Sequence, residues 1–194
     1  MKIAIHQPEH FPYMGFFQKM NSVDLFIILD DVQYTKGGWQ NRNKFLNKNN
    51  VEEFFTAQVE KGANKKLIKD VKLAGGPWRR KIINKIKLNF GFDMSHIYEK
   101  TNLLEMNMSS INWSREKLNI NTKMIMASSL SVESSKTDRI IDICQIVGAN
   151  EYVCGQGCID PRYGAYLDTS AFSDIKLTIH KPILKNYYSV IYNV

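Results

Sequence analysis

Residues 23–29, Val-Asp-Leu-Phe-Ile-Ile-Leu, form a nearly continuous apolar run that is rich in β-branched side chains. Such a run is typical of a central parallel strand that is buried on both faces. A shorter apolar run at residues 2–5 precedes it, and residues 13–20 between the two have apolar side chains at helical spacing. Strand, helix and strand in about thirty residues predict one right-handed βαβ unit. The sequence therefore predicts an α/β fold with a Rossmann-like, mostly parallel sheet and flanking helices.

The rest of the chain continues this alternation of strands and helices. With 194 residues and 44% hydrophobic side chains, we expect a single domain with a real core and a small inserted strand and helix segment at about residues 37–110. Further strands are expected at residues 53–59, 67–73, 124–128, 151–154 and 175–179. Helices are expected at residues 77–90, 94–106 and 136–147, with an ambiguous stretch from residue 114 and a helical turn at residues 163–168.

The bulk charge favours anionic partners. A formal charge of +7 and a pI near 9.2 suit nucleotides and phosphosugars, although a solvated lysine-rich surface is the commoner cause of such values. The basic residues are scattered, so we expect no nucleic-acid partner. No run is apolar enough for a signal peptide or a membrane span, and the three cysteines are an odd number. We therefore expect a cytoplasmic protein with free thiols and no membrane insertion.

A first motif, residues 6–19, lies where the first strand ends. A histidine at that point, His6, suits phosphate binding or acid–base catalysis. Gly15 would let a helix start approach an anion closely, and Lys19 would add a positive charge one turn later. The alternative is an ordinary strand-to-helix turn whose histidines and prolines are structural. We consider the two readings about equally supported.

Two carboxylates, Asp30 and Asp31, end the strand at residues 23–29. Ligands of open α/β sheets bind beyond the carboxyl ends of the strands, so we expect both aspartates near His6, where they would hold an amine or a Mg²⁺ ion that accompanies a nucleotide. No other cofactor is expected. A metal between His6 and His10 is disfavoured, because Pro8 prevents the helix that this spacing requires.

A second motif, residues 29–45, gathers polar side chains around an indole. Trp39 suits stacking on a sugar or base, and Arg42 suits a two-point clamp on phosphate or carboxylate. The amides that would read hydroxyl groups are Gln33, Gln40, Asn41 and Asn43. The alternative is a solvated loop followed by an edge strand, which we favour less because the segment lacks a core-facing period.

Later segments give weaker signals. Residues 78–81, Trp-Arg-Arg-Lys, could bind phosphate at a helix start, but exposed basic side chains are more common. Cys154 enters a glycine turn without a neighbouring base, so a buried thiol is favoured over a nucleophile. Cys154 and Cys158 also lack the second cysteine pair of a zinc site.

The motifs together resemble the WbqC-like family of bacterial proteins over nearly the whole chain. The residues that carry the resemblance are His6-Gln7-Pro8, Pro12, Gly15, Lys19, residues 30–33, residues 39–43, Trp78-Arg79, Ser128-Ser129, Tyr152, Gly155 and residues 166–168. The resemblance implies substrate contacts for Gln7, Pro12, Ser128, Ser129, Gly155 and Tyr166 as well. The family pattern has Ser in place of Cys154 and differs around residues 154–163. This chain ends at Val194 without the apolar helical tail expected of the family, so we expect a C-terminus that is truncated relative to the family.

The resemblance also implies a setting, the assembly of O-antigen or capsule. We therefore expect a transferase that adds an acyl or aminoacyl group to a nucleotide-linked amino sugar, or acts on another anionic small molecule. His6 would be the acid or base and Lys19 a donor to the oxyanion. Two alternatives stay open: a nucleotidyltransferase or other ATP-dependent activating enzyme, and a non-enzymatic accessory protein that binds sugar nucleotides.

Overall fold

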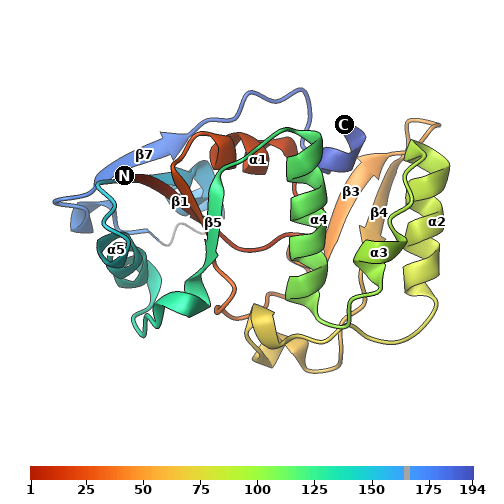
Figure 1. The fold of residues 1–194 in the computed structure, drawn as a ribbon, viewed down its shortest axis with the longest axis horizontal. Helices are drawn as coiled ribbons and strands as arrows, with labels where there is room; N and C mark the ends of the chain where they lie inside the picture. Colours follow the sequence, from red (N-terminus) through yellow and green to blue (C-terminus); the bar gives the residue numbers. More distant parts are fainter. Residues whose placement is uncertain (164–166) are drawn as a thin grey trace. The chain divides into compact units, whose positions relative to one another are not determined.

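The computed structural model describes residues 1–163 and 167–194 (Figure 1). The chain divides into two compact units. Unit 1 comprises Met1–Gln7, Gln18–Leu29 and Asn121–Ile183, and unit 2 comprises Pro8–Phe17, Asp30–Ile120 and Leu184–Val194. The single domain with an insertion at residues 37–110 stays a prediction.

Unit 1 contains a five-stranded, wholly parallel sheet, which confirms the predicted fold class. The strand order is β5-β2-β1-β6-β7. The strands are β1 (Lys2–His6), β2 (Leu25–Ile28), β5 (Lys123–Met126), β6 (Glu151–Gly155) and β7 (Lys176–His180). Because β2 lies between two strands and is buried at every position, its sequence carries no polar alternation.

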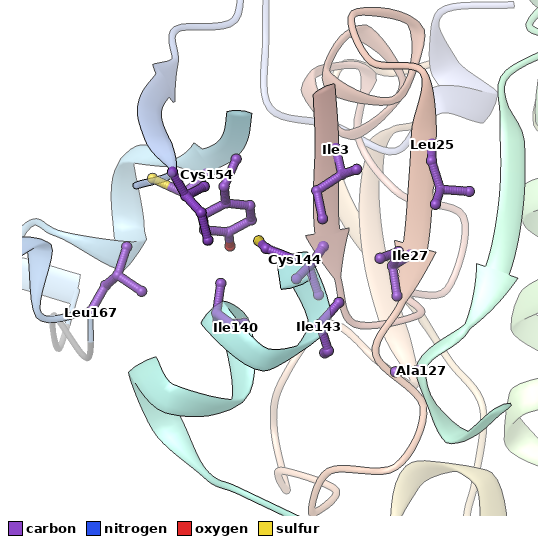
Figure 2. Close-up of a cluster of buried hydrophobic side chains, with 12 residues drawn as sticks. Ile3, Leu25, Ile27, Ala127, Ile140, Ile143, Cys144, Cys154 and Leu167 are labelled. Atoms are coloured by element: carbon purple, nitrogen blue, oxygen red, sulfur yellow. The ribbon is translucent and has the colours of Figure 1, made fainter. Parts of the chain in front are cut away.

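Helix α5 (Lys136–Ile146) supplies the apolar layer on one face of this sheet. Figure 2 shows Ile140 and Ile143 of α5 in the same cluster as Ile3 and Ile27 of the central strands. Side chains alternate along a strand, so Ile3 and Ile5 face this cluster while His6 belongs to the opposite face. The helix α1 (Met14–Asn21) follows β1 in the chain.

Unit 2 contains an antiparallel hairpin and three helices. The elements are β3 (Arg42–Leu46), β4 (Glu52–Thr56), α2 (Trp78–Phe90), α3 (Ser95–Tyr98) and α4 (Leu103–Lys117). Phe45 and Phe55 fill the inner face of the hairpin, and their rings lie 5.8 Å apart. Short 3-10 helices occupy Ala63–Lys65, Ile68–Asp70, Ala127–Leu130, Gln156–Cys158, Pro161–Tyr163, Thr169–Ala171 and Val190–Tyr192.

The strand predicted at residues 67–73 is wrong. Only isolated bridges form there, on either side of the 3-10 helix Ile68–Asp70. The N–H groups of Ile68 and Lys69 donate to the carbonyls of Val32 and Asp30, at 2.9 Å each, so the backbone is satisfied by a loop instead of a strand.

The single helix predicted at residues 94–106 is also wrong, because two helices occupy that region. The Asn102 side chain accepts hydrogen bonds from Leu104 and Glu105 N–H and so begins α4 anew. The helical turn predicted at residues 163–168 falls partly on residues 164–166, which lie outside the described residues. In the described part of the chain, no helix combines the length and apolar character needed to cross a membrane.

The α5 layer gives a test of which side chains stabilise unit 1. Ile143 is fully buried, whereas Ile146 on the same helix is 55% exposed. We expect Ile143→Ala to lower the free energy of unfolding by about 2–5 kcal/mol, because it leaves a cavity. The control Ile146→Ala should change that free energy by less than about 0.5 kcal/mol. Urea denaturation measures both, and equal losses would contradict the packing described here.

Candidate functional site

His6 ends the central strand of unit 1. Its Nδ1 lies 3.0 Å from the carbonyl oxygen of Gln7, so a proton on Nδ1 donates to that carbonyl and leaves Nε2 as an acceptor. Burial, together with the charge of Lys19, lowers the pKa of His6 to about 3, although the hydrogen bond to the Gln7 carbonyl partly opposes both effects. At neutral pH the ring is therefore uncharged and presents a lone pair.

Lys19 places a positive charge close to this imidazole. It lies on α1, is only 4% exposed, and its Nζ is 5.9 Å from the centre of the Phe26 ring. The same charge lowers the pKa of His6, and it partly opposes the Cys158 thiol and burial, which raise the pKa of Cys154. The structure thus brings His6 and Lys19 together in unit 1, as the first motif predicts, whereas their catalytic roles stay a prediction.

Other predicted residues of unit 1 also lie at the carboxyl edge of the sheet. Gly155 ends β6, and a Cβ built there would meet no heavy atom within 4 Å. Ser128 and Ser129 follow β5, where Ser129 Oγ donates to the Met126 carbonyl at 2.7 Å. Gln7 directly follows β1, and Tyr166 lies outside the described residues. Substrate contacts of these residues stay predictions.

His180 is a residue of this edge that the sequence analysis missed. It ends β7 and pairs with Gly155 of β6. Because Ile179 packs on the α5 side, His180 belongs to the same face of the sheet as His6. The signal was available, since a histidine directly follows the apolar strand predicted at residues 175–179.

The paired aspartates belong to unit 2. His6 pairs with Ile28, so β1 and β2 end at the same edge, but the shared site of His6 with the aspartates stays a prediction. Asp30 is buried and Asp31 is half-buried. No three His, Cys, Asp or Glu side chains among residues 1–163 and 167–194 gather closely enough to hold a metal ion. A Mg²⁺ ion bound with a nucleotide needs only one or two carboxylates, so that prediction is untested.

Three amides of the second motif lie inside unit 2: Gln40, Asn41 and Asn43 are buried. Asn41 Nδ2 donates to the Ala57 carbonyl at 2.7 Å, and Asn43 Nδ2 donates to the carbonyl of Phe11 at 2.7 Å. These bonds satisfy backbone groups that the fold buries. This geometry supports a structural role for the two asparagines, and substrate contact stays a prediction.

Two exposed aromatic rings lie close to the Arg42 guanidinium of the second motif. The Arg42 Cζ lies 5.7 Å from the Trp39 ring centre and 5.4 Å from that of Phe54, and these rings are 43% and 42% exposed. Within the described chain, Arg42 donates no hydrogen bond and makes no ion pair. A guanidinium held by rings and without a carboxylate partner suits an anionic ligand. Phe54 was missed, because its role depends on the pairing of β3 with β4.

The remaining predicted residues hold the backbone of unit 2. The Pro12 carbonyl accepts from Val190 N–H at 2.8 Å, and Gln33 Nε2 donates to the Asn64 carbonyl at 2.6 Å. Gly15 is buried in the first turn of α1. In the weaker motif of residues 78–81, Arg79 donates to the carbonyls of Tyr98 and Lys100, so the fold already uses its guanidinium.

His10 is a fully buried histidine of unit 2. Its Nε2 lies 3.0 Å from the Tyr98 hydroxyl, and its ring meets those of Phe11, Phe55 and Tyr98 edge to face. Burial lowers the pKa of His10 to about 3, with the Asn107 amide opposing that shift. His10 is therefore neutral at pH 7 and is a structural residue of the aromatic core.

Comparisons with known proteins agree with the motif analysis. The model of the WbqC-like protein family matches residues 7–191. "Uncharacterized protein Rv1507c" of Mycobacterium tuberculosis is 27% identical over 190 residues, which cover 92% of this chain and 80% of that protein. No solved structure matches the chain significantly.

Burial of His10 predicts a loss of stability in acid. The folded pKa lies near 3, below the ordinary value of 6.5. As the pH falls from 6.5 towards 3, the unfolded chain binds a proton at His10 that the folded protein does not bind. The free energy of unfolding therefore falls by about 1.4 kcal/mol per pH unit. The variant His10→Gln lacks this imidazole. We therefore expect its free energy of unfolding to fall by about 1.4 kcal/mol less per pH unit than that of the unaltered protein. Urea titrations at pH 7.5, 6 and 5 test this, and identical slopes would contradict it.

The pairing of Lys19 with His6 gives a second prediction. Removal of the Lys19 charge in Lys19→Met should raise the pKa of His6 measurably, while Lys123→Met, at the exposed start of β5, should leave it unchanged. NMR titration of the His6 ring measures the shift. An unchanged His6 pKa in Lys19→Met would show that the two groups do not interact.

Proposed function

Because this chain belongs to the WbqC-like protein family, we propose that it is a transferase of bacterial surface-polysaccharide assembly. Its substrate is an amino sugar on a nucleotide carrier, to which it adds an acyl or aminoacyl group. The observation that carries the proposal is the neutral His6, which ends a central parallel strand beside the charge of Lys19. Strand ends of this kind are the usual ligand sites of open α/β sheets.

The acid–base chemistry follows from the state of His6. Acyl transfer to an amine requires a base for the proton of the attacking nitrogen. With Nδ1 bonded to the Gln7 carbonyl, Nε2 of His6 is the acceptor for that proton. A pKa near 3 makes the free protein a weak base. A bound anion would offset the charge of Lys19 and raise the His6 pKa, so the base becomes stronger once substrate binds.

The nucleotide fits the charge and the exposed rings of unit 2. Unit 2 holds 18 Lys and Arg against 11 Asp and Glu, whereas unit 1 holds 8 of each, so unit 2 carries the whole net charge of +7. Arg42 supplies the phosphate contact, and Trp39 supplies a stacking surface for a base or sugar. Asp30 and Asp31 serve the amine or a nucleotide-bound Mg²⁺.

Binding is tested first. Tryptophan fluorescence is followed while UDP- and dTDP-linked amino sugars are added, and Trp39→Phe identifies the signal of Trp39 among three tryptophans. We expect Arg42→Gln to weaken binding roughly tenfold or more, because a charged hydrogen bond to phosphate is lost. Arg80→Gln, which removes an exposed arginine of α2, is the matched control and should bind normally. Equal affinity in Arg42→Gln would remove Arg42 from the site.

Turnover is tested second. The same sugars are incubated with acyl-CoA or aminoacyl donors, and mass spectrometry detects the modified sugar. His6→Gln should lower turnover about 10²–10⁴-fold while the sugar nucleotide still binds. Asp30→Asn and Asp31→Asn should each lower it more than roughly tenfold. Unchanged turnover in His6→Gln would refute the catalytic role.

The same assays separate the alternatives. Mg²⁺-dependent hydrolysis or exchange of a nucleoside triphosphate, lost in His6→Gln, would replace the transferase by a nucleotidyltransferase or activating enzyme. Binding of sugar nucleotides without any turnover would leave a non-enzymatic accessory protein. Absence of binding to every sugar nucleotide and to ATP would refute the proposal as a whole.

A further inference from the structure

Three neighbouring strands of unit 1 end in a row of histidine, glycine and histidine. Ala4 of β1 pairs with Val153 of β6. Two residues later, β1 ends at His6 and β6 ends at Gly155. Gly155 pairs with His180, the last residue of β7. Because β6 lies between β1 and β7, and strands are about 4.8 Å apart, the Cα atoms of the two histidines are about 10 Å apart.

The other end of the same strands shows from which face these side chains project. Lys2, Glu151 and Lys176 form a row there, with Glu151 on the middle strand. Lys2 Nζ lies 3.6 Å and Lys176 Nζ lies 3.3 Å from a carboxylate oxygen of Glu151, so the three side chains share one face. His6 and His180 each lie four residues further along their strands, and therefore project from that face as well.

The middle position of the histidine row carries no side chain, although neither conformation nor crowding requires a glycine there. The backbone of Gly155 has φ −77° and ψ 160°, an extended conformation that every residue type adopts. A Cβ built on it would meet no heavy atom of the described residues within 4 Å. Glycine weakens a strand, and it often marks a place where a ligand approaches the backbone closely. The row thus leaves a space between two imidazoles.

A buried ammonium group brings positive charge to this face. Lys19 of α1 is only 4% exposed, and its Nζ lies 5.9 Å from the centre of the Phe26 ring. Phe26 of β2 pairs with Ala4, two residues before His6. Since Leu25 and Ile27 face the α5 cluster, Phe26 belongs to the same face as His6. An anionic group beside His6 would therefore be attracted by this ammonium group.

We propose that the space over Gly155, between His6 and His180, is a subsite for a phosphoryl group. With its Nδ1 proton donated to the Gln7 carbonyl, His6 offers an acceptor at Nε2, whereas His180 carries an N–H donor in either tautomer. A phosphate monoester has a second pKa of about 6, so part of it still carries an O–H for His6 near neutral pH. A carboxylate is fully ionised at that pH and has no such proton.

His180 thereby becomes a binding residue of the sheet edge that carries the candidate base. The three residues of the row are all half-buried, so the space remains open to a ligand from solvent. The inference goes beyond the proposed transferase reaction, because it requires neither an amino sugar nor an acyl donor. Phosphate binding without any turnover would refute the reaction and leave the subsite standing.

NMR of the histidine rings in the full-length chain tests the subsite with inorganic phosphate as the probe. The chain has four histidines, and a phosphate titration at constant ionic strength should shift the ring signals of His6 and His180 in parallel and to saturation. His96 is exposed on α3 and reports non-specific binding, whereas His10 is buried in unit 2. Neither of these two signals should saturate with the others.

Variants of the row test the geometry. Gly155→Val should abolish the saturable shift, because its side chain occupies the space, while urea denaturation shows stability unchanged or raised. Gly75→Val is the matched control, since a Cβ there also meets no described heavy atom within 4 Å, and it should bind phosphate normally. His180→Gln should weaken phosphate binding roughly tenfold, through the loss of a hydrogen bond to a charged group.

Three outcomes would overturn the inference. The ring signals of His6 and His180 could fail to saturate, His96 could shift as much as His180, or folded Gly155→Val could bind phosphate with unchanged affinity. Circular dichroism confirms that each variant is folded. Gly155→Ala, which adds a single methyl group, and His180→Gln keep the test decisive if Gly155→Val does not fold.

Discussion

The burial of β1 determines the protonation state of His6, the candidate base of unit 1. This strand lies between β2 and β6, and its side chains contact protein on both faces. Desolvation is therefore the largest influence on His6, where the strand ends, and it keeps the imidazole neutral. The charge of Lys19 acts in the same direction. A lone pair on Nε2 at neutral pH is thus a consequence of strand burial, and the nearby Cys154 thiol is subject to the same desolvation.

Unit 2 uses its polar side chains in a different way. Asn43 and Asn107 donate their amide protons to carbonyls of the segment Pro8–Phe11, at distances of 2.7–3.2 Å. Ser189 donates to the Phe11 carbonyl at 2.9 Å. Because Pro8 begins this segment and Pro12 directly follows it, the segment cannot satisfy its carbonyls in a helix or a sheet, and buried amides do so instead. Arg42 is half-buried, and its Nε makes no hydrogen bond within the described part of the chain, so this guanidinium remains available for a ligand.

The net charge is divided as unevenly as the polar contacts. Unit 1 is neutral by formal charge, whereas unit 2 carries all of the excess lysine and arginine. Along the chain these residues are scattered, so the sequence pattern alone favours a solvated surface. Grouped by unit, the whole net charge of +7 falls in unit 2, which favours an anionic ligand there more strongly than the average over the chain does.

The sequence by itself determined where the strands of the parallel sheet lie, because hydrophobic periodicity is a local property of the chain. The apolar runs at residues 2–5 and 23–29, and the helix at residues 136–147, needed no knowledge of their neighbours. Only the tertiary structure decided which polar residues face solvent. Asn41 and Arg42 are adjacent in sequence, yet Asn41 is buried and donates to a backbone carbonyl, whereas the Arg42 guanidinium lies close to two exposed rings. The alternation of side chains and the pairing of β3 with β4 place these two side chains in different surroundings. The wrong strand prediction at residues 67–73 has a similar cause, because the hydrogen-bond partners of that segment lie in the distant loop 30–32. Contacts between residues far apart in the chain are fixed by packing, which a local pattern does not contain.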